Sequence, residues 1–116
     1  PQYAEAYYNR GWNKGKLKDY KGAISDYKKA IEINPQYVEA FNNIAFIKRK
    51  KEINDNYGSI FYATKAIEID PNSANSYLNR GVAKENIGDL QGACEDWRKA
   101  SSLGNESTAK WVRKQC

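Results

Sequence analysis

Apolar residues recur three or four positions apart through most of the chain. In one stretch they are Tyr20, Ala23, Ile24, Tyr27, Ala30 and Ile31. This spacing matches the turn of an α-helix and gives it one buried stripe. We therefore predict a helix from about Lys21 to Ile33, and a preceding one from about Glu5 to Leu17. Pro35 ends the pair because proline lacks an amide hydrogen and restricts the residue before it.

The predicted helix pair is repeated along the chain. Residues 7–30 return as residues 77–100, with 11 of 24 positions identical. Residues 30–35 return 36 positions later as residues 66–71. These offsets divide the chain into units at 4–37, 38–73 and 74–107, the middle one lengthened by two residues in the turn 52–56. A fixed period of this length is typical of stacked repeats.

The unit resembles the tetratricopeptide repeat (TPR) in its length and in its characteristic residues. The first unit has the aromatic, small, alanine and proline residues of that pattern: Tyr7, Gly11, Ala23, Tyr27, Ala30 and Pro35. The third has Tyr77, Gly81, Ala93, Trp97 and Ala100. The second departs from it, because Ser59 and Ala63 replace the usual alanine and aromatic residue. The resemblance implies an all-α, right-handed superhelical solenoid of three helix pairs plus a C-terminal capping helix.

Both ends of the sequence resemble parts of further repeats. Pro1-Gln2-Tyr3 returns as Pro35-Gln36-Tyr37, so we interpret residues 1–3 as the tail of a preceding repeat in a longer, bacterial-type array. Residues 108–116 are predicted to cap the third unit, because terminal repeats otherwise expose an apolar face. We expect the first helix pair to leave such a face bare, with Tyr7 and Tyr27 on it, and to self-associate there.

In the tetratricopeptide family, the first helix of each pair lines a concave groove that holds a peptide. The resemblance places ten candidate residues in that groove: Tyr8, Asn9, Trp12, Asn42, Asn43, Phe46, Arg49, Lys50, Leu78 and Asn79. The implied partner is another protein or peptide, bound as an extended segment.

Trp12 is the strongest candidate for a ligand anchor. Trp97 and Trp111 fall on core positions, where we expect them to be buried with Tyr27 and Tyr77, whereas nothing in the repeat requires an aromatic residue at Trp12. The alternative is that Trp12 packs locally, against Tyr8 or the adjoining unit. Phe46 holds the same place one unit later, so the two rings could form a shared apolar wall.

Asn9, Asn43 and Asn79 hold the same position in the three units. A primary amide both donates and accepts hydrogen bonds, so a row of amides suits the backbone of an extended ligand. The alternative is local hydrogen bonding between adjacent first helices, and both could occur together.

The segment Lys48-Arg49-Lys50-Lys51 is the densest run of charge. Its three interpretations are a solvated surface, a site for an acidic partner segment, and a nucleic-acid contact. The formal charge of +5, from 19 Lys and Arg against 14 Asp and Glu, favours acidic partners. Nucleic acid is disfavoured because glutamates at 5, 39 and 85 interrupt the groove face.

One subclass of the family grips the terminal carboxylate of chaperone tails with lysines, asparagines and an arginine. The matching positions here are Tyr8, Trp12, Asn43, Asn75 and Asn79, and only Asn43 agrees. A chaperone-tail ligand is therefore not expected.

The first and third units each have an arginine and an aspartate at two matching positions, and the second unit has neither. We predict salt bridges between Arg10 and Asp26 and between Arg80 and Asp96. The middle unit replaces both partners with apolar residues, Ile44 and Tyr62.

Cys94 and Cys116 are the only two cysteines. They fall near the start of the third unit's second helix and the end of the capping helix, which should run antiparallel, so a disulfide could join them. The alternative is two free thiols in a reducing cytoplasm, which we favour because the compartment is unknown.

Catalysis has little support in the composition. The chain has no histidine, the commonest general base and metal ligand, and its two cysteines lack the spacing of a zinc site. We expect no enzyme activity, metal or cofactor. Apolar stretches are too short to span a membrane, and the compartment is taken as cytoplasmic by default. The predicted function is a protein-binding scaffold, and the alternative is a spacer or self-association segment with no ligand of its own.

Overall fold

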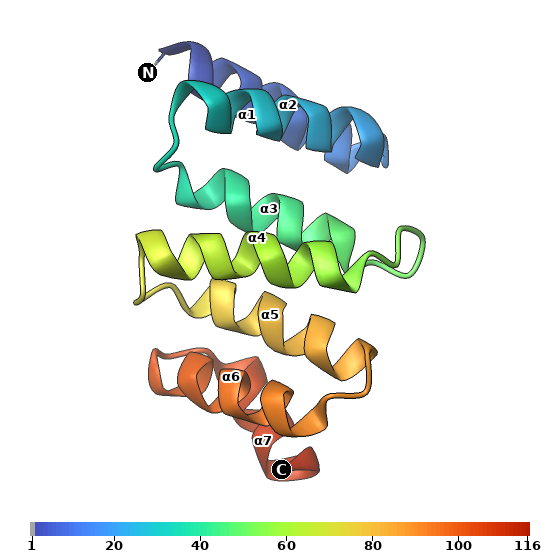
Figure 1. Ribbon diagram of the computed structural model, residues 1–116, viewed down its shortest axis with the longest axis vertical. Helices are drawn as coiled ribbons and strands as arrows, with labels where there is room; N and C mark the ends of the chain where they lie inside the picture. The colour runs from blue at the N-terminus through green and yellow to red at the C-terminus, as the bar shows by residue number, and fades with distance from the viewer. Residues whose placement is uncertain (1) are drawn as a thin grey trace.

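The computed structural model describes residues 2–116, which form seven α-helices and no strand. The helices are α1 (Gln2–Lys16), α2 (Tyr20–Ile33), α3 (Val38–Lys48), α4 (Asn56–Ile69), α5 (Ala74–Asn86), α6 (Leu90–Ser102) and α7 (Glu106–Gln115). In Figure 1 the pairs α1–α2, α3–α4 and α5–α6 follow one another down the long axis, with α7 at the far end. This is the predicted all-α solenoid of three helix pairs and a C-terminal helix. Among the described residues, no helix is both long and apolar enough to cross a bilayer.

The N-terminal helix extends further than the sequence predicts. It begins at Gln2 rather than Glu5, so Gln2 and Tyr3, which we assigned to the tail of a preceding repeat, are helical. Pro1, the other residue of that tail, lies outside the described residues. In the second copy of this segment, Asn34 Oδ1 accepts a hydrogen bond from the Gln36 amide at 3.1 Å and holds a turn before α3. That turn has no described counterpart before Tyr3.

An Asp-x-x-Gly sequence starts the second helix of every pair. The aspartate is the N-cap residue, and its carboxylate accepts a hydrogen bond from the glycine amide, at 2.8 to 3.0 Å in the three copies. A Cβ atom on the glycine would collide with this carboxylate. The pairs are Asp19–Gly22, Asp55–Gly58 and Asp89–Gly92.

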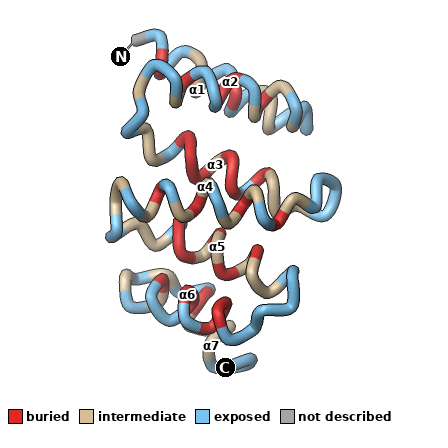
Figure 2. The backbone as a smooth tube through the Cα atoms, in the orientation of Figure 1, coloured by how far each residue is buried: buried red, intermediate tan, exposed pale blue. Residues whose placement is uncertain are grey.

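Burial is concentrated where neighbouring helices meet, as Figure 2 shows along α3 and α5. Tyr27, Tyr77 and Trp97 are at most 9% exposed, as predicted. Trp111 was also expected to be buried but is only partly so. Its ring packs edge-on against Trp97, with 5.3 Å between centroids, while no further helix of the described chain covers the outer side of α7.

Small residues of the first helices face large ones of the second. A Cβ added to Gly81 would lie 2.5 Å from Trp97 Nε1, and one added to Gly11 would lie 3.0 Å from a Tyr27 ring carbon. The middle repeat places alanine at this position. There Ser59 Oγ donates a hydrogen bond to the Ala45 carbonyl at 2.7 Å, and the side chains opposite are small. The size of the first-helix residue is therefore matched to the residue opposite.

Both predicted salt bridges are present. Each arginine makes two hydrogen bonds of 2.8 to 2.9 Å to its aspartate, Arg10 to Asp26 and Arg80 to Asp96. The hydrogen bond from Arg10 is the main cause that holds the pKa of Asp26 below its usual range. In the middle repeat, Ile44 is fully buried instead.

A disulfide joins Cys94, near the start of α6, to Cys116, which follows α7. Their Cα atoms are 5.9 Å apart although 22 positions separate them in sequence. The structure therefore has the disulfide and not the two free thiols that we favoured, and the predicted antiparallel packing of α6 and α7 brings the two cysteines together. The bridge ties α7 to the third repeat.

Candidate functional site

A cavity of about 200 Å³ opens between α1, α2 and α3. Its walls are mainly apolar, and we call it the α1–α3 cavity. It is lined by Trp12, Gly15, Lys16, Tyr20, Tyr27, Asn43, Phe46, Ile47 and Lys50. Four of the ten groove residues predicted from the sequence thus meet here: Trp12, Asn43, Phe46 and Lys50.

The two predicted anchor residues present their rings to solvent at this cavity. Trp12 is 51% exposed and Phe46 is 43% exposed, so neither contributes mainly to the core. Tyr8, the residue that Trp12 could have packed against, instead lies with its ring 5.0 Å from that of Tyr37 and 5.4 Å from that of Tyr27. Both Trp12 and Phe46 are therefore placed to contact a ligand.

A second cavity of about 330 Å³ lies between α3 and α5. We call it the α3–α5 cavity, and its lining residues are Asn42, Asn43, Phe46, Arg49, Asn75, Leu78 and Asn79. Because Asn43 and Phe46 line both cavities, the two adjoin and form one groove along the first helices. Eight of the ten predicted residues line this groove.

Tyr8 and Asn9, the other two predicted residues, line neither cavity. Tyr8 is partly buried, and its hydroxyl accepts a hydrogen bond from Asn43 Nδ2 at 3.0 Å. Asn9 is exposed on α1. Tyr8 therefore contacts the groove residue Asn43 without lining either cavity, whereas Asn9 lies outside the groove.

The three equivalent asparagines do not form a uniform row. Asn43 Nδ2 donates to the hydroxyls of Tyr8 and Tyr27, and Asn79 Nδ2 donates to the Asn42 carbonyl at 3.3 Å. Asn79 is 5% exposed, so its amide mainly links α5 to α3. These bonds match the alternative of local hydrogen bonding between helices.

A buried acceptor in the α3–α5 cavity has no partner among the described residues. Asn42 is 9% exposed and donates weakly to Ser73 Oγ at 3.4 Å, but its Oδ1 atom accepts no hydrogen bond. This oxygen is inaccessible as well as unpaired, so a ligand in the cavity reaches it only if the Asn42 side chain moves.

The four basic residues 48–51 have different surroundings, and only two of them line the groove. Lys48 forms an ion pair with Asp55, 2.9 Å from its Nζ to Oδ2, while Lys51 is exposed on the loop that follows. Arg49 and Lys50 line the α3–α5 and α1–α3 cavities, respectively. Lys48 is the last residue of α3, and Arg49 to Lys51 lie in the turn that follows it, so adjacent charges reach different surroundings.

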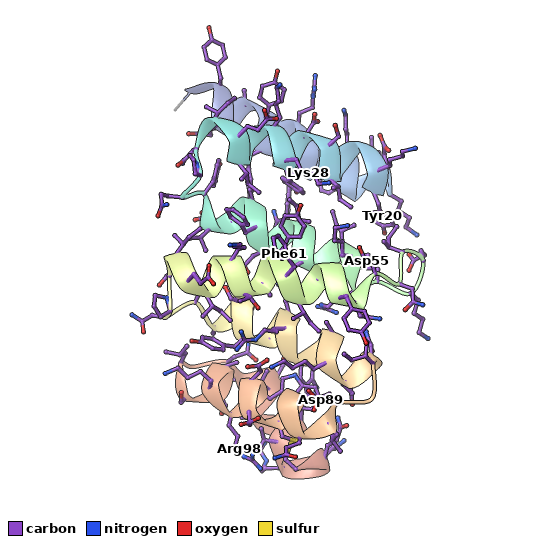
Figure 3. All side chains as sticks on the ribbon, in the orientation of Figure 1. Tyr20, Lys28, Asp55, Phe61, Asp89 and Arg98 are labelled. Carbon is purple, nitrogen blue, oxygen red and sulfur yellow. A yellow bond between two sulfur atoms is a disulfide. The ribbon has the colours of Figure 1, made fainter. Side chains whose placement is uncertain are left out.

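Two of the three cations that line the groove, Arg49 and Lys50, lie close to Phe46, and the third is Lys16. The Arg49 guanidinium carbon and the Lys50 ammonium each lie 4.7 Å from the centre of the Phe46 ring. The Lys50 ammonium also lies 5.5 Å from the centre of the Tyr20 ring. Figure 3 shows Tyr20 at the N-terminal end of α2, beside the loop after α3. Within residues 2–116 neither cation pairs with a carboxylate. Burial lowers the pKa of Arg49, although an arginine stays protonated.

Six residues line the groove without being among the ten predicted: Gly15, Lys16, Tyr20, Tyr27, Ile47 and Asn75. Among them, Tyr20 brings an aromatic ring to the cavity wall. It is the first residue of α2, and we assigned the groove to first helices alone. An aromatic residue directly after the N-cap Asp19 is the signal that could have identified it, because that position faces the end of the adjoining first helix.

A third cavity of about 250 Å³ lies on the outer side of α1, lined by Tyr3, Ala6, Tyr7 and Arg10. We expected Tyr27 on this face, but it is buried on the opposite side of the helix pair, where it contacts Asn43. Burial raises the pKa of Tyr27 to about 12.

The groove offers apolar rings, side-chain amides and cations. In the described part of the chain, no three His, Cys, Asp or Glu side chains come close enough together to hold a metal ion.

Comparison with known proteins matches two segments to family models. Residues 4–37 and residues 62–95 each match a model described as tetratricopeptide repeat. No curated protein matches the sequence.

Several solved structures have the same fold. The first TPR domain of Spaghetti (RPAP3), bound to the HSP90 peptide SRMEEVD, is 21% identical with a TM-score of 0.91 over 97% of this chain and 90% of that one. The TPR domain of Arabidopsis OM64 is 25% identical, with a TM-score of 0.89 over 97% and 93% of the two chains. The N-terminal domain of STI-1 from C. elegans is 24% identical, with a TM-score of 0.85 and the same coverage.

Proposed function

The chain belongs to the tetratricopeptide repeat family, and from this we propose that it is a protein–protein interaction scaffold. It binds an extended, partly acidic segment of another protein in the groove made by the α1–α3 and α3–α5 cavities. The observation that carries this proposal is that three first helices bring eight predicted residues into two adjoining cavities.

The chemistry of the groove supports an extended peptide. Trp12 and Phe46 offer apolar rings, which commonly dominate binding energy at interfaces. Asn75 lines the α3–α5 cavity and is exposed, so its side-chain amide is available to the backbone of a ligand. Arg49 and Lys50 lack carboxylate partners within the described chain, so acidic side chains of a ligand would complement them.

The similar RPAP3 domain was solved with an HSP90 peptide, which supports peptide binding by a domain of this fold. The ligand of this chain is nevertheless expected to differ, because only Asn43 matches the chaperone-tail clamp. We predict that amidating the terminal carboxylate of a labelled SRMEEVD peptide leaves its affinity unchanged, because the clamp for that group is absent.

Selection from a displayed library of random peptides tests the proposal. Selected peptides should be enriched in acidic residues. Trp12→Ala should weaken their binding by roughly 30-fold, which corresponds to an interface hot spot of about 2 kcal/mol. Tyr57→Ala is the matched control, because Tyr57 is a 74% exposed aromatic residue that lines neither cavity.

Three outcomes are distinguishable in this experiment. Loss of affinity with Trp12→Ala but not with Tyr57→Ala supports the groove. Equal affinity for both variants would move the binding site elsewhere. Failure to select any peptide would favour the second candidate function.

The second candidate is a self-associating or spacer segment of a longer array. The observation that favours it is a difference between equivalent arginines: the Arg10 side chain is 60% exposed, whereas that of Arg80 is 20% exposed. Arg80 is covered where α5 packs on α4 and donates to Thr64 Oγ1 at 3.3 Å. The same face of α1, with Tyr3 and Tyr7, is free to accept another helix.

Sedimentation over a range of concentrations tests this candidate. Association that is abolished by a Tyr3→Ser, Tyr7→Ser double variant would support it. A strictly monomeric wild-type chain would exclude self-association through this face.

A further inference from the structure

The α1–α3 cavity has the size and surroundings of a socket for a single side chain. Its volume of about 200 Å³ exceeds the roughly 150 Å³ of an apolar protein cavity that takes up benzene. Trp12, Tyr20 and Phe46 supply aromatic walls. Gly15 leaves one wall open, because the nearest heavy atom to a Cβ placed there is 3.9 Å away. An aromatic or large aliphatic side chain fits these conditions.

The rim of the socket is positively charged. Lys16 and Lys50 line it, and neither forms an ion pair with any residue between 2 and 116. An anchor side chain flanked by acidic residues is therefore favoured over one flanked by basic residues.

The adjoining α3–α5 cavity contains a cation without a counterion. The Nε atom of Arg49 donates to Asn79 Oδ1 at 3.1 Å, while its two terminal nitrogens make no hydrogen bond within the described chain. A partly buried charge is stable when a carboxylate pairs with it, and a guanidinium presents its nitrogens in the geometry that a carboxylate accepts. Asn42 and Asn75 supply further polar atoms around this position.

The spacing between the two subsites follows from their shared wall. Phe46 and Asn43 line both cavities, so the ligand groups that fill them are separated by little more than one side chain. In an extended peptide, side chains on the same face are two residues apart, or about 6.6 Å along the strand.

We propose that the groove recognises a three-residue motif: an aromatic or large aliphatic side chain in the α1–α3 cavity and, two residues away, an aspartate or glutamate bound by Arg49. The proposal rests on the function proposed above and specifies its ligand. It predicts a recognition rule, because the two subsites set both residue type and spacing.

A spacing series of peptides tests the motif. Each labelled peptide has one phenylalanine and one aspartate in a serine–glycine background, with the two placed from one to five positions apart in either order. Binding is measured by fluorescence anisotropy. The peptide with a spacing of two should bind about tenfold more tightly than the others, and replacing either residue with serine should remove that advantage.

Two protein variants assign the subsites. Gly15→Leu fills the α1–α3 cavity and should abolish the preference for phenylalanine while keeping that for aspartate. Arg49→Gln should do the reverse. Lys51→Gln is the control for the loss of one charge, because Lys51 is exposed and lines neither cavity. If Gly15→Leu proves unfolded by circular dichroism, the serine-substituted peptides still report on the aromatic subsite.

The possible results separate this inference from the proposed function. Affinity that does not depend on spacing, or that Arg49→Gln leaves unchanged, overturns the motif. If library peptides bind in a Trp12-dependent manner but lack this motif, the scaffold function stands and the inference fails. If no peptide of either kind binds, both fail.

Discussion

Replacing Gly81 with alanine should destabilise the protein, whereas the same replacement at Gly15 should stabilise it. Both residues lie in first helices of their pairs. A Cβ at Gly81 would lie 2.5 and 2.6 Å from two atoms of the Trp97 ring, closer than non-bonded atoms approach. Trp97 is 1% exposed and cannot swing aside. At Gly15 the nearest atom is 3.9 Å away.

The magnitudes follow from two opposing effects. Alanine is favoured over glycine in a helix by up to about 1 kcal/mol, and this applies to both sites. Overpacking a tight core costs about 1 to 3 kcal/mol, and this applies to Gly81 alone. With the penalty at the upper end for an immobile ring, Gly81→Ala should lose about 2 kcal/mol and Gly15→Ala should gain up to about 1 kcal/mol.

Urea unfolding followed by circular dichroism, with the disulfide intact, measures both changes. A double-mutant cycle with Trp97→Leu identifies the cause, because removing the ring should remove most of the penalty of Gly81→Ala. The packing argument is refuted if Gly81→Ala is as stable as Gly15→Ala. It is also refuted if the penalty persists in the Trp97→Leu background.

Three further predictions concern titration and the disulfide. The lowered pKa of Asp26 means that its carboxylate stabilises the fold above about pH 4 and that this stability is lost as the pH falls through the folded-state pKa. Asp26→Asn should therefore flatten the acid limb of stability against pH, and an unchanged limb would contradict this. The pKa of Tyr27, about 12, implies that stability declines from about pH 10 to pH 12, and Tyr27→Phe should reduce this decline in alkaline urea titrations. Reduction of the Cys94–Cys116 bridge should cost about 3 kcal/mol and speed amide exchange in α7 but not in α1, and equal exchange rates in α7 before and after reduction would contradict it.

The repeat made most of the fold predictable. Identity at an offset of 70 residues and the spacing of apolar positions specify helix pairs, because both reflect contacts repeated in every unit. The joint replacement of Arg10 and Asp26 equivalents in the middle unit identified the salt bridges in the same way. Prediction succeeded for contacts that every unit shares, and for contacts whose two partners are both replaced in one unit.

Prediction was weaker for residues whose partners are specific to one place. Position within the repeat put Arg49 on the groove face, but it could not show that Lys48 forms an ion pair with Asp55. Asn9 and Asn79 occupy equivalent positions, yet one is exposed and the other buried, because a helix covers one and not the other. Trp111 was predicted to be buried but is only partly so, because no further helix of the described chain covers α7. Periodicity specifies a face of a helix, while neighbouring elements decide what that face meets.

Two contacts join the helices of the first and third repeats: a glycine against an aromatic ring, and an arginine–aspartate pair. The middle repeat has neither. Its helices α3 and α4 also share the least extensive contact of the three pairs. Because the stability of a repeat array is the sum of unit and interface contributions, this repeat depends more than the others on its interfaces with both neighbours. Yet α3 carries Phe46, a wall of both cavities, and leads directly into Arg49. A ligand that fills both cavities would contact α1, α3 and α5 together, so its binding should reinforce the interfaces on which the middle repeat depends.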